Sequence, residues 1–269
     1  MLQQTWSAGV AISGGVGRFV SWDGGCLFIG EKVGLVPPHA HYAIQIVFGS
    51  DPGVRLRPDN ASPWQVYDGA IIASRQPHTM DAAGLPGNAV LFVEPETREG
   101  RALVEHHLDQ GITPMPAVAY AARGPVFDAY HDGSEEELVR AARQFVSILT
   151  DGVEPQKVTD ERILRAMRYI NLNLTRPLTL EEVAREACLS PSRCRHLMVE
   201  QLGMGLRQYI LWRRFLRVWK LLSDGATLSE AAHAAGFADA PHLARTSRRN
   251  FGFPPSMMLV GPKRREDES

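Results

Sequence analysis

The chain has 269 residues, of which 44% are apolar, so it is long enough for two domains with cores of their own. It contains no stretch of about 18 uncharged apolar residues, which excludes a transmembrane helix. The segment Met1–Gly17 lacks the basic region and apolar core of a signal peptide, so we expect a cytoplasmic protein with no membrane partner. Three cysteines without a Cys-x-x-Cys pair indicate neither a disulfide framework nor a zinc ribbon.

The formal net charge of −1 conceals an asymmetry between two parts of the chain. Residues 156–269 hold 19 Lys and Arg against 12 Asp and Glu, a net charge of +7. Residues 1–155 hold 10 against 18, a net charge of −8. A basic part beside an acidic one is typical of a nucleic-acid-binding domain joined to a domain with another task.

Residues 5 to about 93 have the rhythm of an all-β domain. Short apolar segments at Ala43–Phe48, Ala70–Ser74 and Ala89–Val93 are separated by clusters of Gly, Pro, Asp and Asn. This spacing predicts a small barrel or sandwich. Along the first of these segments, alternation predicts that Ile44, Ile46 and Phe48 share a face that packs against helices or a second sheet.

Two helices and a linker are expected to follow the strands. The first covers Arg98–Asp109, and the second begins at Ser134, which forms a capping-box pattern with Glu137 three residues on. The second helix continues to about Leu149, and its apolar stripe predicts either a homodimer interface or packing on the chain's own barrel. The stripe consists of Leu138, Ala142, Phe145 and Leu149. Asp151–Pro155 is typical of a linker, so we expect domains at residues 1–155 and 156–269.

The C-terminal part contains an internal duplication. Thr179 with Glu182, and Thr227 with Glu230, each form a capping box at the start of a short helix with a narrow apolar stripe. A tight turn follows each helix, and Ser190 and Asp239 then serve as N-caps of new helices that end at glycines 203 and 252. Two helix-turn-helix units in matching register are much more specific than one.

The outward faces of the second helix in each unit carry polar and basic side chains. Arginine suits both guanine edges and phosphates, so these faces predict DNA contacts; the alternative is a solvated basic surface. They hold Ser192, Arg195 and His196 in the first unit, and His242, Arg245, Arg248 and Arg249 in the second. A long helix at Leu206–Ser223 should fix the distance between the units. On it Arg213, Arg217 and Lys220 form a stripe suited to phosphates.

Residues 160–260 resemble the DNA-binding domain of AraC/XylS-type transcriptional regulators. The segments that carry the resemblance are Pro177–Ala184, Leu189–Arg193, Ala235–Asp239 and Arg248–Pro255. The resemblance implies a sequence-specific regulator with double-stranded DNA, a small-molecule effector and RNA polymerase as partners. It also implies that Ser192, Arg195 and His196 read bases from the first unit, and His242 and Arg245 from the second. Ser247 stands where the family usually carries a core phenylalanine.

The N-terminal part resembles, more loosely, the family's cupin-like sensor barrel. The expected fold class is therefore α+β, with a cupin-like β-barrel and flanking helices followed by an all-α domain of two helix-turn-helix units. His39, His41 and Gln45 alternate onto one strand face, and His78 follows a later strand. This pattern resembles a cupin metal site, but Gln45 stands near the place of the usual acidic ligand, and amides bind divalent transition metals poorly.

We therefore expect no metal and no cofactor, and predict that His39, His41, Gln45 and His78 bind a small organic effector. The alternative is that these side chains only satisfy buried polar groups of the barrel. Competing functions are a cupin oxygenase, a DNA-repair enzyme with a reactive cysteine, and an architectural DNA binder. The first lacks the carboxylate ligand, the second lacks an activated thiol, and the third leaves the acidic barrel unexplained. We expect a protein that is not an enzyme and has no catalytic residues.

Overall fold

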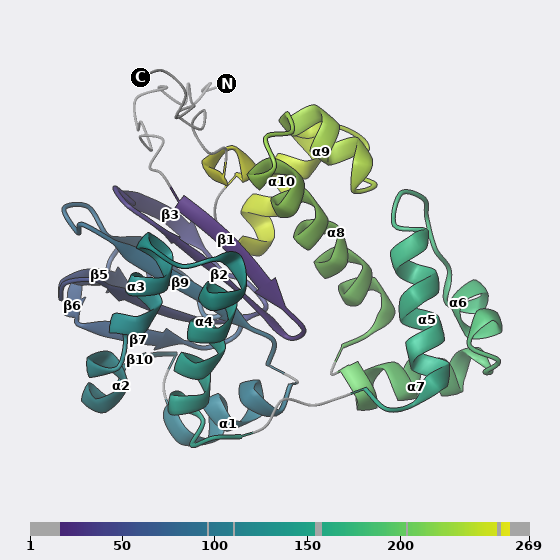
Figure 1. Cartoon of the computed structure of the whole chain (residues 1–269), viewed down its shortest axis with the longest axis horizontal. Helices are drawn as coiled ribbons and strands as arrows, with labels where there is room; N and C mark the ends of the chain where they lie inside the picture. The colour runs from purple at the N-terminus through teal and green to yellow at the C-terminus, as the bar shows by residue number, and fades with distance from the viewer. Residues whose placement is uncertain are drawn as a thin grey trace.

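The structure is a computed structural model that describes residues 17–95, 97–109, 111–153, 158–202, 204–251 and 254–258. Antiparallel sheets with flanking helices form the N-terminal part, and the C-terminal part is helical (Figure 1). The predictions for residues 5–16, for the last two linker residues, for the domain boundary at residues 155/156 and for the helix ends at glycines 203 and 252 lie outside the described residues.

The strands form two sheets, so of the barrel or sandwich that the strand spacing predicts, the structure has the two-sheet arrangement. The larger runs in the order β1-β2-β9-β4-β7-β10, and the smaller in the order β3-β8-β5-β6. The larger sheet consists of β1 (Gly17–Trp22), β2 (Gly25–Gly30), β9 (Asn88–Val93), β4 (Ile44–Gly49), β7 (Gly69–Ile72) and β10 (Ile112–Pro114). The smaller consists of β3 (Leu35–His39), β8 (His78–Asp81), β5 (Val54–Arg57) and β6 (Gln65–Tyr67). The three segments predicted as strands are β4, β7 and β9, with ends shifted by one or two residues.

The alternation predicted for β4 is confirmed. Ile44, Ile46 and Phe48 lie in a core between the larger sheet and the N-terminal helices. Val47 points to the opposite side, into a second core between the two sheets with Val36, Leu56, Ile72 and Met80. A strand buried on both faces needs this division of side chains between two cores.

Four helices cover the first face of the larger sheet: α1 (Arg98–His107), α2 (Ala117–Ala121), α3 (Gly124–His131) and α4 (Glu135–Leu149). The capping box at Ser134 is present and starts α4 as predicted. Leu138, Phe145 and Leu149 of this helix are fully buried in the chain's own core. The predicted homodimer interface through this stripe is therefore wrong, because the same apolar face packs on the sheet.

Six helices follow: α5 (Glu161–Leu172), α6 (Leu180–Glu186), α7 (Pro191–Leu202), α8 (Leu206–Ser223), α9 (Leu228–Ala234) and α10 (Ala240–Phe251), with a last turn of 3₁₀ helix at Pro255–Met258. In Figure 1, α8 joins the group α5–α7 to the pair α9 and α10, which lies beside the sheets. Among the described residues, no helix has the length and apolarity needed to span a bilayer.

Candidate functional site

Both helix-turn-helix units begin with the predicted capping boxes. Thr179 Oγ1 accepts the backbone N–H of Glu182 at 3.2 Å, and the Glu182 carboxylate accepts the N–H of Thr179 at 2.9 Å. Thr227 and Glu230 repeat the arrangement at 3.3 and 2.8 Å. The reciprocal bonds satisfy backbone donors that a short helix would otherwise leave unpaired, so they fix where α6 and α9 begin.

The turns of the two units share one backbone conformation. Cys188 after α6 has φ 54° and Gly236 after α9 has φ 84°, both in the left-handed region. Gly236 also approaches the first unit closely, because a Cβ there would lie 2.1 Å from the carbonyl oxygen of Leu174. The second turn therefore packs directly against the segment between α5 and α6, and the two units meet at a glycine.

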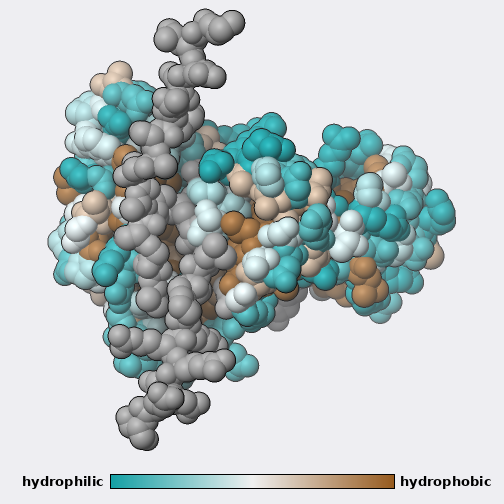
Figure 2. Space-filling view, turned by 90° about the horizontal axis from the view of Figure 1, so that it is seen from above, coloured by the Kyte–Doolittle hydropathy of each residue, from teal (hydrophilic) through white to brown (hydrophobic). Residues whose placement is uncertain are grey.

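Helix α7 presents the predicted polar face of the first unit. Ser190 caps the helix by accepting the N–H of Arg193 at 3.3 Å. Cys194, Leu197 and Met198 are buried against α5 and α6, whereas the face predicted to read DNA is exposed. That face holds Ser192, Arg195 and His196. In Figure 2 this unit projects away from the sheets with a largely hydrophilic surface.

Helix α10 presents the corresponding face of the second unit. Asp239 caps it by accepting the N–H of His242 at 2.6 Å, and Leu243, Ser247 and Phe251 are buried. Arg245, Arg248 and Arg249 are exposed, as predicted. The ring of His242 is half-buried, and its Nδ1 accepts the N–H of Ala238 at 3.3 Å. The neutral ring therefore carries its proton on Nε2, on the side away from the turn.

The basic stripe predicted on α8 is divided in the structure. Arg217 is exposed, as a phosphate contact requires. Arg213 donates to Asn171 Oδ1 at 2.9 Å and lies 4.0 Å from the carboxylate of Asp23.

Lys220, the third member of that stripe, lies 3.2 Å from Asp224 and 3.6 Å from Glu135. Asp23 and Glu135 belong to the acidic N-terminal part, so the charge asymmetry between the halves also acts inside the molecule.

Arg214, which the sequence analysis missed, joins α8 to the first unit. Its guanidinium donates to the backbone carbonyls of Leu174 at 2.9 Å and Arg176 at 3.1 Å. The carbonyl of Leu174 is the same one that the glycine turn of the second unit approaches. A single backbone oxygen thus lies at the meeting point of α8 and both units.

An aromatic cluster joins the second unit to the outer face of β1, β2 and β9. Phe19 and Phe28 lie 5.0 and 4.9 Å from the ring of Trp219 on α8, and Phe92 lies 5.6 Å from Phe251 at the end of α10. The sequence analysis did not predict this contact. The signal was the continuous apolar run at residues 26–29, which is typical of a strand buried on both faces.

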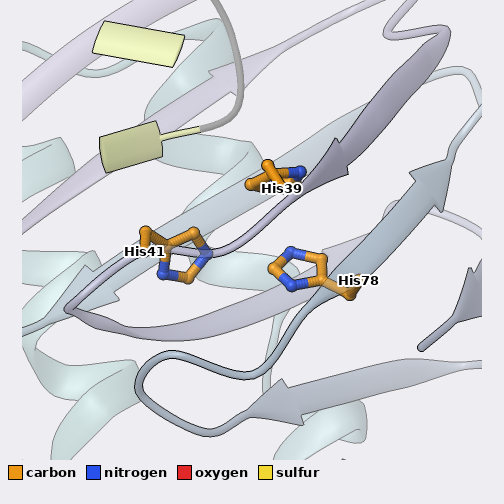
Figure 3. Close-up of side chains that lie close together, drawn as sticks. All are labelled: His39, His41 and His78. Atoms are coloured by element: carbon orange, nitrogen blue, oxygen red, sulfur yellow. The ribbon is translucent and has the colours of Figure 1, made fainter. Parts of the chain in front are cut away.

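Three histidines meet where the chain crosses from the smaller sheet to the larger one (Figure 3). His39 at the end of β3 and His78 at the start of β8 are cross-strand partners, and His41 lies on the segment that leads into β4. One ring nitrogen from each lies within 4.8 Å of those of the other two. The structure thus brings together three of the four residues predicted to form one site, and Gln45 lies against the third imidazole, His41, at 2.7 Å.

Burial and hydrogen bonds define the state of these imidazoles. His41 and His78 are buried and His39 is partly exposed. Desolvation lowers the pKa of all three, to about 4 for His41, so the rings are neutral at pH 7. Each Nδ1 lies 2.8 or 2.9 Å from a backbone carbonyl oxygen: of Pro37 for His39, of Ala43 for His41 and of Gln76 for His78.

A separate cavity of about 730 Å³ lies between the two parts of the chain. Its walls include Asp23 and Glu99 from the N-terminal part, and Met204, Tyr209 and Arg213 from the C-terminal part. This volume is within the range of sites for small organic molecules. The tight histidine cluster is not among its lining residues.

The buried cysteines do not have the environment of a catalytic thiol. Burial raises the pKa of the thiols of Cys26 and Cys194, and the nearby Glu94 raises that of Cys26 further. A reactive cysteine requires the opposite shift.

Comparison with known proteins locates the resemblance in the C-terminal part. A family model described as a helix-turn-helix domain matches residues 183–259. The HTH-type transcriptional regulator YpdC of Escherichia coli is 23% identical over 147 residues, which cover 54% of this chain and 51% of that protein. The arabinose operon regulatory protein of Escherichia coli is 29% identical over 107 residues, 38% of this chain and 36% of that protein. The chain thus spans about half or less of the length of these curated relatives.

The fold of nearly the whole chain has a solved counterpart. The structure of ToxT from Vibrio cholerae bound to an unsaturated fatty acid superposes with a TM-score of 0.50 at 10% identity. The match covers 94% of this chain and 97% of that one. It confirms the predicted α+β class, with antiparallel sheets before a helical domain.

Proposed function

We propose that this chain, whose C-terminal helical part is an AraC-type helix-turn-helix domain, is a sequence-specific DNA-binding transcription regulator. The observation that carries the proposal is the repeated unit: two capped helices, two left-handed turns, and exposed polar faces on α7 and α10. Helix α8 has 18 residues and is about 27 Å long, so it can set the two faces at a spacing near one turn of DNA.

In this proposal residues 156–269 bind DNA and residues 1–155 receive the signal. Ser192, Arg195 and His196 read bases from α7, and His242 and Arg245 from α10. Phosphates are contacted by the exposed arginines Arg217, Arg248 and Arg249, and by Arg213 once it leaves Asp23. Because one chain carries two recognition helices, two major-groove contacts do not require a homodimer.

The N-terminal part is proposed to bind a small-molecule effector, and RNA polymerase is the proposed protein partner at the promoter. That ToxT, a protein of similar fold, is bound to a fatty acid in a solved structure supports a ligand-responsive regulator. Two places in this chain could bind the effector. One is the cluster of His39, His41, Gln45 and His78, and the other is the cavity between the two parts. A ligand at either place acts by binding one arrangement of the two parts more tightly than another.

The test is a selection of binding sites from random duplex DNA with the full-length protein, followed by affinity measurements on single-base variants of the selected site. Arg195→Ala should lose about 1–3 kcal/mol of discrimination at one base position. Arg217→Ala should weaken all sequences alike and reduce the salt dependence of binding, because it removes a phosphate contact. Arg140→Ala on the N-terminal helix α4 removes the same charge and is the control. It should change neither the discrimination between bases nor the salt dependence of binding.

If the selection enriches no sequence and the affinity does not fall with salt, the proposed function is wrong. If Arg195→Ala weakens every sequence to the same extent, the protein still binds DNA, but Arg195 contacts the backbone and the assignment of α7 as the base-reading helix fails.

A further inference from the structure

We propose that His39, His41 and His78 bind a divalent first-row transition ion such as Zn²⁺, and that this ion is an effector of the regulator. The claim that the ion is an effector rests on the proposed function, whereas the claim that the three histidines bind an ion does not. The sequence lacks the carboxylate ligand of the usual site and so predicts no metal. The structure nonetheless supports an ion, because hydrogen bonds fix the tautomer and orientation of the three imidazole rings.

The hydrogen bonds determine which ring nitrogens are free. A carbonyl oxygen only accepts, so each Nδ1 that lies against one must carry the proton and donate it. A neutral imidazole has one proton, so Nε2 of each ring is left with an unprotonated lone pair. Three neutral rings brought together in this state offer acceptors and no donor, which is the arrangement that a cation requires.

Two atoms in the cluster lack a suitable partner. Nε2 of His78 is buried and makes no hydrogen bond to any residue that the structure describes. Nε2 of His41 lies 2.7 Å from Oε1 of Gln45, so two acceptors face each other unless the amide is reversed and donates its N–H. A bound cation satisfies both lone pairs at once, whereas reversing the amide would still leave His78 without a partner.

The backbone carbonyls of Pro37, Ala43 and Gln76 supply the second set of contacts that metal-binding histidines need. Hydrogen bonds from the distal ring nitrogen fix the tautomer and the orientation of each imidazole ligand. Here all three rings have such a bond, each to a carbonyl oxygen two residues away along the chain. These bonds hold Nδ1 of each ring against the backbone and leave Nε2 available to an ion.

The size of the cluster suits an ion rather than an organic molecule. Nitrogens bound to one tetrahedral Zn²⁺ lie about 3.3 Å apart, since each Zn–N bond is about 2.0 Å. The ring nitrogens here lie within 4.8 Å of one another, so the rings need to move inward by about 1 Å or slightly more. His39 is partly exposed and gives the ion a way in from solvent. A water molecule can take the fourth position, with the Gln45 amide beside it.

The ion site lies next to the contact between the sheet and the second helix-turn-helix unit. The ring of His41 is 4.9 Å from that of Phe92, and the ring of Phe92 is 5.6 Å from that of Phe251 at the end of α10. One phenylalanine thus separates the proposed ion from the helix proposed to read DNA. An ion that draws His41 inward changes what Phe92 packs against, and with it the preferred position of α10.

The test begins with the full-length protein treated with a chelator and then dialysed. Titration with Zn²⁺ followed by elemental analysis should give one ion per chain, and Co²⁺ should give the visible absorption of a tetrahedral site. His78→Ala and His39→Ala should both lose the ion. His39 is partly exposed, so its variant reports on binding even if loss of the buried His78 prevents folding. His106→Ala on α1 is the control and should bind the ion as the unmodified chain does.

The second measurement is the affinity for the selected DNA with and without Zn²⁺. We expect the ion to change the dissociation constant about 5-fold or more in the unmodified chain and in His106→Ala, but not in His39→Ala. Less than one ion per chain, or ion binding that survives His39→Ala, overturns the site. One ion per chain with no change in DNA affinity overturns its role as effector. The ion-binding result does not depend on the proposed function, and DNA binding by the ion-free protein is measured separately, so a failure of the proposed function is distinguished from a failure of the ion as effector.

Discussion

Glu94, the residue that follows β9, is a carboxylic acid held in an apolar place. It is 3% exposed, its Oε2 has no hydrogen-bond partner in the described part of the chain, and burial raises its pKa to about 8. It lines a small cavity together with Trp212, Phe215 and Phe251, at the contact between the sheet and the second unit. The folded protein therefore holds this group in its neutral form at pH 7.

The raised pKa of Glu94 predicts that stability falls as pH rises. In the unfolded chain the carboxyl ionises near its ordinary pKa of 4.5, whereas the folded chain keeps the proton up to about pH 8. Between these values the unfolded state binds fewer protons, so the free energy of unfolding decreases by about 1.4 kcal/mol per pH unit from this group. The stabilisation is complete below pH 4.5 and is lost above about pH 8.

Glu94→Gln should remove this contribution, because the amide does not ionise. Urea denaturation at pH 6, 7 and 8 measures it: the variant should gain stability relative to the unmodified chain, and the gain should grow with pH. Glu105→Gln on the exposed side of α1 is the matched control and should follow the unmodified chain. Parallel pH profiles for Glu94→Gln and the unmodified protein would contradict the assignment.

At the scale of elements, the relation between the two helix-turn-helix units depends on one close approach. The turn after α9 reaches the carbonyl of Leu174, and Arg214 of α8 donates to the same oxygen. Only a residue without a side chain fits this contact. Cys188 shows that the equivalent turn of the first unit tolerates a side chain in the same backbone conformation, so the glycine is required by the neighbouring unit as well as by φ.

Gly236→Ala should therefore destabilise the helical part by more than the roughly 1–2 kcal/mol that a left-handed conformation costs an L-residue. The added methyl group would overlap the Leu174 carbonyl and separate the second turn from the first unit. Gly205→Ala at the start of α8 is the control, since no atom of the described residues lies within 4 Å of the added Cβ and φ of Gly205 is −75°. Thermal unfolding of the full chain should show a clearly lower midpoint temperature for Gly236→Ala and little change in that temperature for Gly205→Ala. Equal effects would show that the close contact is not formed.

At the scale of the whole molecule, the larger sheet lies between the helices α1–α4, the smaller sheet, and the pair α8 and α10. One face packs on α1–α4; the opposite face packs on the smaller sheet at its β4–β7 side and on α8 and α10 at its β1–β2–β9 side. The second unit is thus fastened to the N-terminal part through aromatic rings, while the first unit projects outward (Figure 1). A change on the sheet reaches α10 directly, whereas it reaches α7 through α8 and through the contact between the two units at Gly236.

Phe19→Glu should separate the second unit from the sheet. Phe19 is half-buried between Phe28 and Trp219, and a carboxylate among these rings would lose its hydration without gaining a partner. Small-angle X-ray scattering should show a larger radius of gyration, while circular dichroism shows the same helix and strand content. Val66→Glu on β6, where the side chain is 68% exposed, is the control and should leave the radius unchanged. An unchanged radius for Phe19→Glu would mean that this aromatic contact does not hold the two parts together.

The sequence by itself determined the features that depend on neighbours along the chain. Capping boxes at residues 134, 179 and 227, the N-caps of α7 and α10, and the inward and outward faces of these helices follow from spacings of three and four residues. Strand alternation likewise placed Ile44, Ile46 and Phe48 on one packed face of β4. Such patterns are legible because local hydrogen bonds and side-chain periodicity act within one element.

Only the tertiary structure decided which surfaces meet. The stripe on α4 could pack on a second chain or on its own sheet, and the structure places it on the sheet. The basic stripe on α8 looked uniform, yet two of its members face carboxylates from residues almost 200 and almost 90 positions away. The histidines were identified from the sequence, but the register that makes His39 and His78 cross-strand partners depends on the pairing of β3 with β8. An apolar or charged face can pack against many different surfaces, so its sequence alone does not show which one it contacts. The folded chain determines that contact.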